Sequence, residues 1–173
     1  MEVKIPLYGD DIFSHKATTV GQNVPIADLL KTMQALQLKQ RHPCIAAKHT
    51  GVNVRILSIQ SKYDKYEIGQ SLAQILVNPE IVALINPLTP ALESDLCVPN
   101  YEGSIERHSA VEVSFLDEKM RPQSKVFTES AARWVLHGIE LLEGETFIDR
   151  LNLHRQRSIK SHLKRITNLG VGR

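Results

Sequence analysis

The residues with the clearest chemical potential lie in one stretch, residues 130–151, with the sequence SAARWVLHGIELLEGETFIDRL. Within it His137 and Leu141 are four residues apart, so a helix places them on one face. A zinc or iron hydrolase has two histidines at that spacing, with a glutamate directly after the first as the general base. Here the glutamate position is Gly138 and the second histidine position is Leu141. The stretch therefore keeps the spacing of a metal-binding helix but lacks most of its reactive side chains.

Three helices are expected around this chemistry. Apolar residues at three- and four-residue spacing predict a helix from Val24 to Arg41, which Pro43 ends. The stretch itself is predicted as a helix from about Glu129 to Leu142, with Gly144 placed to end it. A last helix is predicted from about Leu153 to Leu169. Its apolar stripe consists of Ile159, Leu163, Ile166 and Leu169.

Strands are predicted between the first two helices. Alternation of apolar and polar residues predicts a strand from Val52 to Gln60, and residues 61–70 are polar and turn-like. Two short apolar runs follow, LAQILV and IVALI, which Asn78-Pro79 separates.

A hairpin is predicted next, with arms from Ser104 to Leu116 and from Gln123 to Thr128 and a turn from Asp117 to Pro122. Strands that follow one another without intervening helices indicate an α+β fold with antiparallel sheets around the His137 helix. No repeat or linker divides the 173 residues, so we predict a single domain, 1–173.

The charge is unevenly distributed along the chain. From Arg150 onward there are seven basic residues and no acid, which leaves 14 bases against 19 acids, a net charge of −5, for the preceding residues. A basic tail predicts either a face for an anionic partner such as RNA or simply a solvated basic helix.

Composition bounds the class of protein. No apolar run approaches the roughly 18 residues of a membrane span, and the acidic start MEVKIPLYGDD resembles no targeting peptide. We therefore expect a cytoplasmic protein without a membrane partner. Cys44 and Cys97 lie far apart without a CxxC pattern, so we expect two reduced thiols.

Three segments together resemble the peptide deformylases, which remove formyl groups from the initiator methionine of new chains. HPCIAAKHTGVNVRI (His42 to Ile56) is similar to GxGLAAxQ-x-GVN-x-R, and ESDLCVP (Glu93 to Pro99) is similar to EGCLSVP. HGIELLEGETFIDRL (His137 to Leu151) is similar to HExDHLxGxxFxDRL. Order and register agree, and VNPEIV at Val77 to Val82 resembles the strand before the second motif.

The resemblance also implies where the family's reactive groups fall. Its three metal ligands correspond to Asp95, His137 and Leu141, and its catalytic glutamate corresponds to Gly138. The glutamine that helps hold the oxyanion corresponds to His49. The glycine before Leu-Ala-Ala corresponds to Cys44, and Leu96 retains the position that contributes a backbone N–H. Only His137 is retained among these reactive side chains, so no catalytic residue is assigned. The resemblance therefore predicts the family fold with a degenerate metal site and with deformylase activity lost or strongly impaired, a pseudoenzyme.

The substrate pocket differs as well. The positions that line the methionine pocket correspond to Pro43, Ala91, Ser130, Arg133 and Trp134. A guanidinium in an apolar pocket carries a large desolvation cost unless it is paired. Two interpretations stay open: Arg133 turns out to solvent while Trp134 packs, or the two residues line a new pocket for an acidic ligand.

One set of side chains could still hold a metal. Asp95, His49 and His137 could form a two-histidine, one-carboxylate set for one divalent iron, zinc or nickel ion, to which Glu140 could contribute. The alternative is no cofactor, with the histidines as hydrogen-bonded structural groups. Cys97 shares the strand face of Asp95, but its register matches the serine of LSVP. The other histidines show no ligand spacing; they are His15, His42, His108, His154 and His162.

The tail suggests a partner. In bacterial deformylases similar to this chain, the C-terminal helix docks the enzyme on the ribosome. Five cations of the last predicted helix could contact RNA phosphates; they are Arg155, Arg157, Lys160, Lys164 and Arg165. Three hypotheses follow: a binder of a peptide N-terminus or the ribosome, a divergent metal-dependent amide hydrolase using Asp95, His49 and His137, and a paralogue that forms homo- or hetero-oligomers with an active deformylase.

Overall fold

The computed structural model describes residues 3–60 and 73–171 and contains one antiparallel sheet. Its strands are β1 (Cys44–Ala46), β2 (Ile56–Ile59), β3 (Gln74–Asp95), β4 (Val98–Leu116) and β5 (Pro122–Thr128). Each strand pairs antiparallel with the next in sequence, in the order β1-β2-β3-β4-β5. The predicted hairpin is confirmed as β4 and β5, with β4 beginning six residues earlier than expected.

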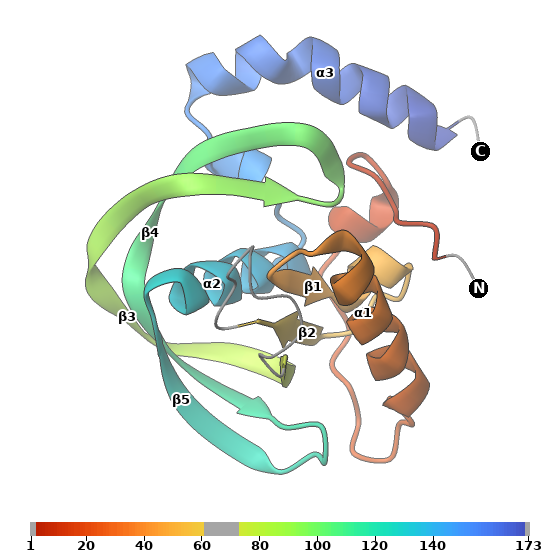
Figure 1. Ribbon diagram of the computed structural model, residues 1–173, viewed down its shortest axis with the longest axis vertical. Helices are drawn as coiled ribbons and strands as arrows, with labels where there is room; N and C mark the ends of the chain where they lie inside the picture. Colours follow the sequence, from red (N-terminus) through yellow and green to blue (C-terminus); the bar gives the residue numbers. More distant parts are fainter. Residues whose placement is uncertain (1–2, 61–72, 172–173) are drawn as a thin grey trace.

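The three predicted helices are present as α1 (Ala27–Gln40), α2 (Glu129–Glu143) and α3 (Leu153–Val171). Short 3-10 turns lie at Asp11–Phe13 (η1), Ala47–Thr50 (η2) and Phe147–Arg150 (η3). Figure 1 shows α2 in the middle of the molecule, α1 beside β1 and β2, and α3 across the curved end of β3 and β4. Strands and helices in this arrangement confirm the α+β fold class.

α2 is the central element of the core. It contacts β1, β2, β4 and β5, and its apolar residues are buried around much of its circumference. Gly144 ends the helix as predicted: its φ of +95° is left-handed, and its N–H donates to the carbonyls of Glu140 and Leu141. A buried central helix can hold a polar side chain inside the core. His137 lies at such a position and is 2% exposed.

The two short apolar runs predicted around Asn78-Pro79 form one long strand, which corrects the sequence interpretation. β3 continues from Gln74 to Asp95 through Pro79, Pro87 and Pro90. It pairs with β2 only over Gln74 to Val77, and four register shifts interrupt its pairing with β4. Among the described residues, β3 beyond Val77 pairs on one side only, and its bulges leave further N–H groups unused, so prolines that would break a central strand are tolerated here.

The first predicted strand is shorter than expected. β2 begins at Ile56, because Val54 instead makes an isolated parallel bridge with Thr18. The predicted polar turn at residues 61–70 lies outside the described residues. Within the described part of the chain, no helix is long and apolar enough to cross a membrane.

Candidate functional site

Four side chains from three elements meet in the interior beside α2. His49 comes from η2, Glu93 and Asp95 come from the end of β3, and His137 comes from α2. All are at most 3% exposed. Glu93 and Asp95 are two residues apart on one strand, so both point to the face that α2 covers. The structure thus brings together Asp95, His49 and His137, as the sequence predicts.

Asp95 is the centre of this cluster. Its Oδ1 accepts from His49 Nε2 at 3.0 Å and from the backbone N–H of Cys97 at 2.8 Å. Its Oδ2 lies 2.8 Å from His137 Nε2. Burial alone would raise the pKa of the Asp95 carboxyl, but His49 and His137 hold this pKa well below its usual range. The carboxylate is therefore ionised and fully hydrogen-bonded.

His137 lies between two carboxylates. Its Nε2 faces Asp95 and its Nδ1 lies 3.1 Å from Glu93 Oε2. A ring with an acceptor at each nitrogen is satisfied when both nitrogens carry protons. Burial would lower the pKa of His137, but the hydrogen bonds to Asp95 and Glu93 outweigh it and raise the pKa to about 9. His137 is therefore an imidazolium cation at neutral pH.

The ring of His49 has a defined tautomer. Its Nδ1 accepts the backbone N–H of Ala46 at 3.1 Å, so the ring proton is on Nε2 and is donated to Asp95. A nitrogen that carries a proton has no lone pair for a metal. His49 is thus a donor to the carboxylate in this arrangement.

Glu93 connects the cluster to two buried arginines. Arg107 donates to both carboxylate oxygens, at 2.6 and 2.9 Å, and Arg133 Nη1 donates to Oε1 at 2.7 Å. Burial would raise the pKa of Glu93, but hydrogen bonds from His137 and Arg107 lower it to about 2. Arg107 also pairs with Glu140 at 2.8 Å, which orients Glu140 towards the arginine rather than towards Asp95.

Sequence reasoning missed this part of the site. The pairing of Glu93 with Arg107 and Arg133 joins residues 14 and 40 positions apart. The available signal was the position of Glu93 two residues before Asp95, which predicts that both face the same side of a strand. Nothing in the spacing of the arginines identified their partner.

Arg133 does not turn out to solvent, which corrects one of the two open interpretations. It is 7% exposed. Besides Glu93, its guanidinium donates to the carbonyls of Ile105 and Thr89, at 2.9 and 2.5 Å. Trp134 packs edge-on against the rings of His42 and His137, at centroid distances of 5.2 and 5.4 Å. Pairing with a buried carboxylate supplies the compensation that a buried guanidinium needs.

The remaining predicted pocket residues are dispersed. Pro43 is buried, whereas Ala91 and Ser130 are exposed. The cysteines are free, and burial raises the pKa of both Cys44 and Cys97 well above the usual thiol value. Neither thiol is therefore present as a thiolate at neutral pH.

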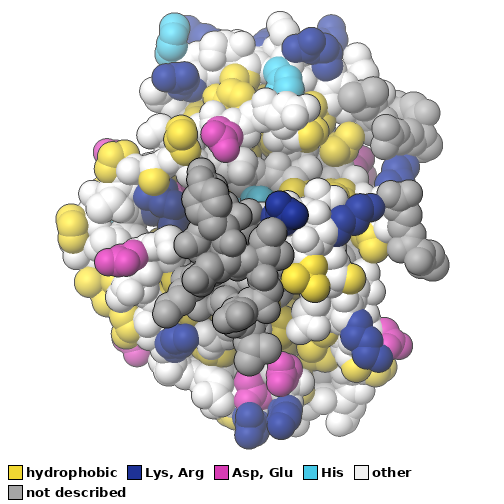
Figure 2. Space-filling view, viewed as in Figure 1, with side chains coloured by type: hydrophobic (Ala, Val, Ile, Leu, Met, Phe, Trp, Pro, Cys, Tyr) yellow, Lys and Arg dark blue, Asp and Glu magenta, His cyan; other side chains and the backbone are white. Residues whose placement is uncertain are grey.

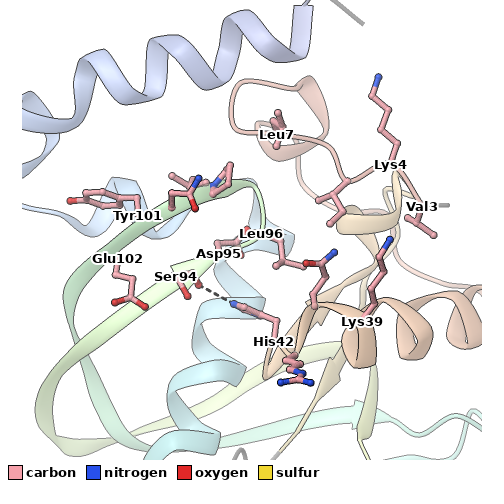
Figure 3. Close-up of a pocket in the computed structure, with 16 residues that line it drawn as sticks. Val3, Lys4, Leu7, Lys39, His42, Ser94, Asp95, Leu96, Tyr101 and Glu102 are labelled. Atoms are coloured by element: carbon pink, nitrogen blue, oxygen red, sulfur yellow. Dashed lines mark hydrogen bonds between the residues drawn. The ribbon is translucent and has the colours of Figure 1, made fainter. Parts of the chain in front are cut away.

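A cleft of about 1170 Å³ opens in front of the cluster. Figure 3 shows the His42 ring pointing towards Ser94, with Lys4 and Lys39 on one side of the cleft and Tyr101 and Glu102 on the other. His42 Nε2 lies 3.2 Å from the Ser94 carbonyl and His42 Nδ1 lies 2.6 Å from the Cys44 carbonyl. The turn between β3 and β4 and the start of β4 also line the cleft.

The basic tail is ordered as α3. Ile159 and Ile166 are buried, and His162 contacts the carbonyl of Pro99 at 3.0 Å. The five predicted cations are all exposed and make no salt bridge within the described residues; they are Arg155, Arg157, Lys160, Lys164 and Arg165. Figure 2 shows Lys and Arg side chains gathered over this end of the molecule.

Comparison with known proteins assigns the family. Residues 3–157 match the polypeptide deformylase family. The chain belongs to the peptide deformylase family. It is 30% identical to the peptide deformylase of Synechocystis sp. over 145 residues, which cover 83% of this chain and 76% of that protein. It is 27% identical to the Chlorobium limicola enzyme over 94% of this chain and 88% of that protein.

Solved structures agree with the fold. The peptide deformylase 1B of Arabidopsis thaliana in complex with an inhibitor is similar with a TM-score of 0.86 at 24% identity, over 94% of this chain and 89% of that chain. The Acinetobacter baumannii peptide deformylase bound to Met-Ala-Ser has a TM-score of 0.80 at 26% identity, over 87% and 99%. The resemblance carried by the three motifs is therefore confirmed at the level of family and fold.

Within this family fold, Gly138 and Leu141 lie on the side of α2 that faces the core. A Cβ at Gly138 would lie 2.9 Å from Cys44 Sγ and 2.9 Å from each methyl group of Leu57. Cys44 and Leu57 are completely buried, so the space beside Gly138 is filled. Leu141 is 1% exposed and belongs to the apolar core. Leu96 lines the cleft.

Proposed function

We propose that this member of the peptide deformylase family has lost formyl-Met deformylation, or retains it only strongly impaired, and acts by binding. The observation that carries the proposal is the buried ionic cluster in which His137 bridges Asp95 and Glu93. In this cluster charged protein groups neutralise one another where the resemblance places the family's metal.

The donor set argues against a catalytic metal. Such a site needs three protein ligands and an open position. Leu141 offers no lone pair, the His49 ring proton is on Nε2, and the carboxylates of Glu93 and Asp95 on either side of His137 favour a proton on each of its nitrogens. Asp95 alone remains, and both of its oxygens already accept hydrogen bonds. The residues present therefore do not fit the family's metal.

Proton transfer lacks a group as well. Gly138 has no side chain, and Cys44 and Leu57 occupy the space into which one would extend. A missing general base costs about two to four orders of magnitude in rate. Because Cys44 and Leu57 fill the space beside Gly138, the packing supports the proposal that the core has adapted to the absence of a general base at this position.

The methionine-pocket positions support the same proposal. Arg133 is tied to Glu93 and to the carbonyls of Ile105 and Thr89, while Trp134 packs against His42 and His137. An apolar substrate side chain at these positions would meet a paired guanidinium and an indole. Displacing Arg133 would leave Glu93 with one arginine fewer in a buried setting, which is costly.

A divergent metal-dependent hydrolase is the alternative, because Asp95, His49 and His137 do converge. It would require His49 to give up its bond with Ala46 and His137 to lose one of its two ring protons. Metal analysis after dialysis of the purified protein against iron, nickel or zinc tests the two proposals. We expect far less than one equivalent of metal, unchanged in a His137→Gln variant. One equivalent that this variant loses would support the hydrolase and contradict the loss of the site.

For the binding role, we propose the ribosome as partner through the exposed face of α3. Arg157, Lys160 and Lys164 recur at helical spacing on the side away from Ile159 and Ile166. Cations without carboxylate partners suit RNA phosphates. A ribosome-bound protein would act in the cytoplasm, near the N-termini of nascent peptides, and we propose that the cleft beside Asp95 binds them.

Co-sedimentation with purified ribosomes tests this role. We expect binding that weakens from 50 to 200 mM salt, as phosphate contacts do. Arg157→Glu/Lys160→Glu should abolish it, whereas the matched Lys31→Glu/Lys119→Glu variant, with exposed lysines elsewhere, should bind normally. Equal binding by both variants would contradict the proposal.

The third proposal, association with an active deformylase, is distinguished by sedimentation velocity. A mixture of this chain with the Synechocystis enzyme would show a new, faster boundary if the two associate. Separate, unchanged boundaries over the micromolar range would exclude such a complex for this pair.

A further inference from the structure

The outer part of β3 exposes an unusual apolar surface. Every residue from Glu80 to Leu92 is exposed, and none from Ile81 to Leu92 is charged. Six of the eleven exposed large apolar side chains of the described residues lie on this strand; they are Ile81, Val82, Leu84, Ile85, Leu88 and Leu92. Figure 2 shows hydrophobic side chains along the edge of the molecule that β3 and β4 form in Figure 1. Contiguous apolar surface of this kind marks an interaction site.

Part of this surface forms a groove. Ile81, Leu84 and Leu88 line a cavity of about 730 Å³ that α2 closes with Leu136 and Ile139. The three β3 side chains are 42%, 49% and 51% exposed, while the two α2 side chains are nearly buried and form the floor. An exposed apolar wall with an apolar floor gives a bound segment side-chain contacts on two sides.

The charges around this groove determine which segment suits it. Its two arginines are neutralised: Arg107 pairs with Glu93 and Glu140, and Arg150 pairs with Glu140. Glu106 and Glu145 also line the groove, are exposed, and make no salt bridge within the described residues. The free charge is therefore negative, which repels an anionic lipid surface or nucleic acid and attracts Lys or Arg.

We propose that this groove docks an amphipathic segment of a partner protein that carries leucine-like residues on one face and lysine or arginine beside them. The apolar residues would cover Ile81, Leu84 and Leu88, and the cations would pair with Glu106 and Glu145. Helix-in-groove recognition works in this way, with apolar anchors for affinity and flanking charges for specificity. The groove lies on a different surface from the cleft beside Asp95, so the proposal is independent of whether deformylation is lost.

Fluorescence anisotropy of the full chain with two labelled peptides tests the proposal. The probes are an 18-residue amphipathic Leu/Lys peptide and its Leu/Glu counterpart. We expect saturable binding of the Leu/Lys peptide and at least about tenfold weaker binding of the Leu/Glu peptide. Equal affinities would overturn the proposal, as would concentration-dependent self-association that excludes the Leu/Lys peptide, because a second copy would then be the occupant.

Matched variants locate the site. Glu106→Gln/Glu145→Gln and Leu84→Ser/Leu88→Ser should each weaken the Leu/Lys peptide at least about tenfold. Glu118→Gln and Leu38→Ser, which change an exposed acid and an exposed leucine away from the groove, should leave binding unchanged. These side chains are exposed, so all four variants should fold, which circular dichroism verifies. Unaltered binding by both groove variants would overturn the proposal.

Discussion

At the scale of single residues, the hydrogen bonds of Asp95, His137 and His49 determine which of their atoms could still bind a metal or move a proton. Asp95 accepts three hydrogen bonds, His137 donates at both ring nitrogens, and His49 accepts at Nδ1. Each of these hydrogen bonds uses a lone pair that a metal would need or places a proton on a nitrogen that would have to bind the metal. Asp95 and His137 are buried and paired, and His49 donates a hydrogen bond to the same carboxylate, so removal of one partner leaves a buried charge unpaired.

The charge of His137 predicts a pH dependence of stability. Its pKa is raised from 6.5 in the unfolded chain to about 9 in the folded protein, so its contribution is complete below about pH 6.5 and is lost as the pH rises through about 9. Urea unfolding of the wild type and His137→Gln should show a difference in unfolding free energy that shrinks by about 3 kcal/mol between pH 6 and pH 10. A constant difference would show that His137 is uncharged in the folded state.

The contact of Gly138 with Cys44 predicts a packing effect. Alanine has the higher helix propensity by about 1 kcal/mol, yet Gly138→Ala should destabilise the protein by about 1–3 kcal/mol because its Cβ meets buried atoms. The loss should be smaller in a Cys44→Gly background, which removes one of the two clashes. Thermal unfolding of the four proteins in this cycle measures the coupling. Equal losses in both backgrounds would mean that Cys44 does not occupy the space.

At the scale of secondary structure, buried polar contacts fix the C-terminal end of α2 beside the site. Arg107 links β4 to Glu140 of α2, and the completely buried Lys48 of η2 donates to the carbonyls of Leu141 and His15, at 2.7 and 2.6 Å. Burial lowers the pKa of Lys48 to about 8. Its ammonium group therefore remains charged at pH 7 and holds the end of α2, where helix carbonyls lack partners, against the N-terminal segment.

Replacement of this anchor should be costly. Lys48→Met keeps a long side chain but leaves two buried carbonyl contacts unmade, so we expect a loss of about 2–4 kcal/mol in unfolding free energy. Lys31→Met, which changes an exposed lysine of α1, should lose less than about 0.5 kcal/mol. Denaturant unfolding at pH 7 compares them. If the two variants are equally stable, Lys48 does not anchor α2.

The same scale shows where sequence reasoning succeeds and fails. Periodicity, together with Pro43 and Gly144, predicted α1, α2 and α3, because helix propensity and capping are local. Sequence reasoning divided β3 at Asn78-Pro79, because proline normally ends a strand. Proline is tolerated here because the pairing of β3 with β2 stops at Val77, which is a tertiary feature that the local sequence does not reveal. The convergence of Asp95, His49 and His137 was predicted through the family resemblance. The arginine partners of Glu93 were not, since ion pairs across β3, β4 and α2 leave no spacing signal.

At the scale of the whole molecule, the peptide deformylase fold carries three separate candidate sites. The sheet and α2 keep the architecture of the peptide deformylases, with a TM-score of 0.86 to the Arabidopsis enzyme. The cluster around Asp95, the cationic face of α3 and the apolar groove beside β3 lie on different parts of that architecture. Function resides in such sites rather than in the fold. Retained scaffold and altered site together support a binding role on an enzyme fold.

The most direct test of the central claim is deformylation itself. The protein is incubated with excess Fe²⁺, Ni²⁺ or Zn²⁺ and assayed for formate release from formyl-Met-Ala-Ser, beside the Synechocystis peptide deformylase. Our proposal that the chain lacks a general base and a fitting metal site predicts a kcat/KM at least about four orders of magnitude below that of the Synechocystis enzyme. Turnover within about tenfold of it would contradict the account and would mean that Asp95, His49 and His137 form a working site.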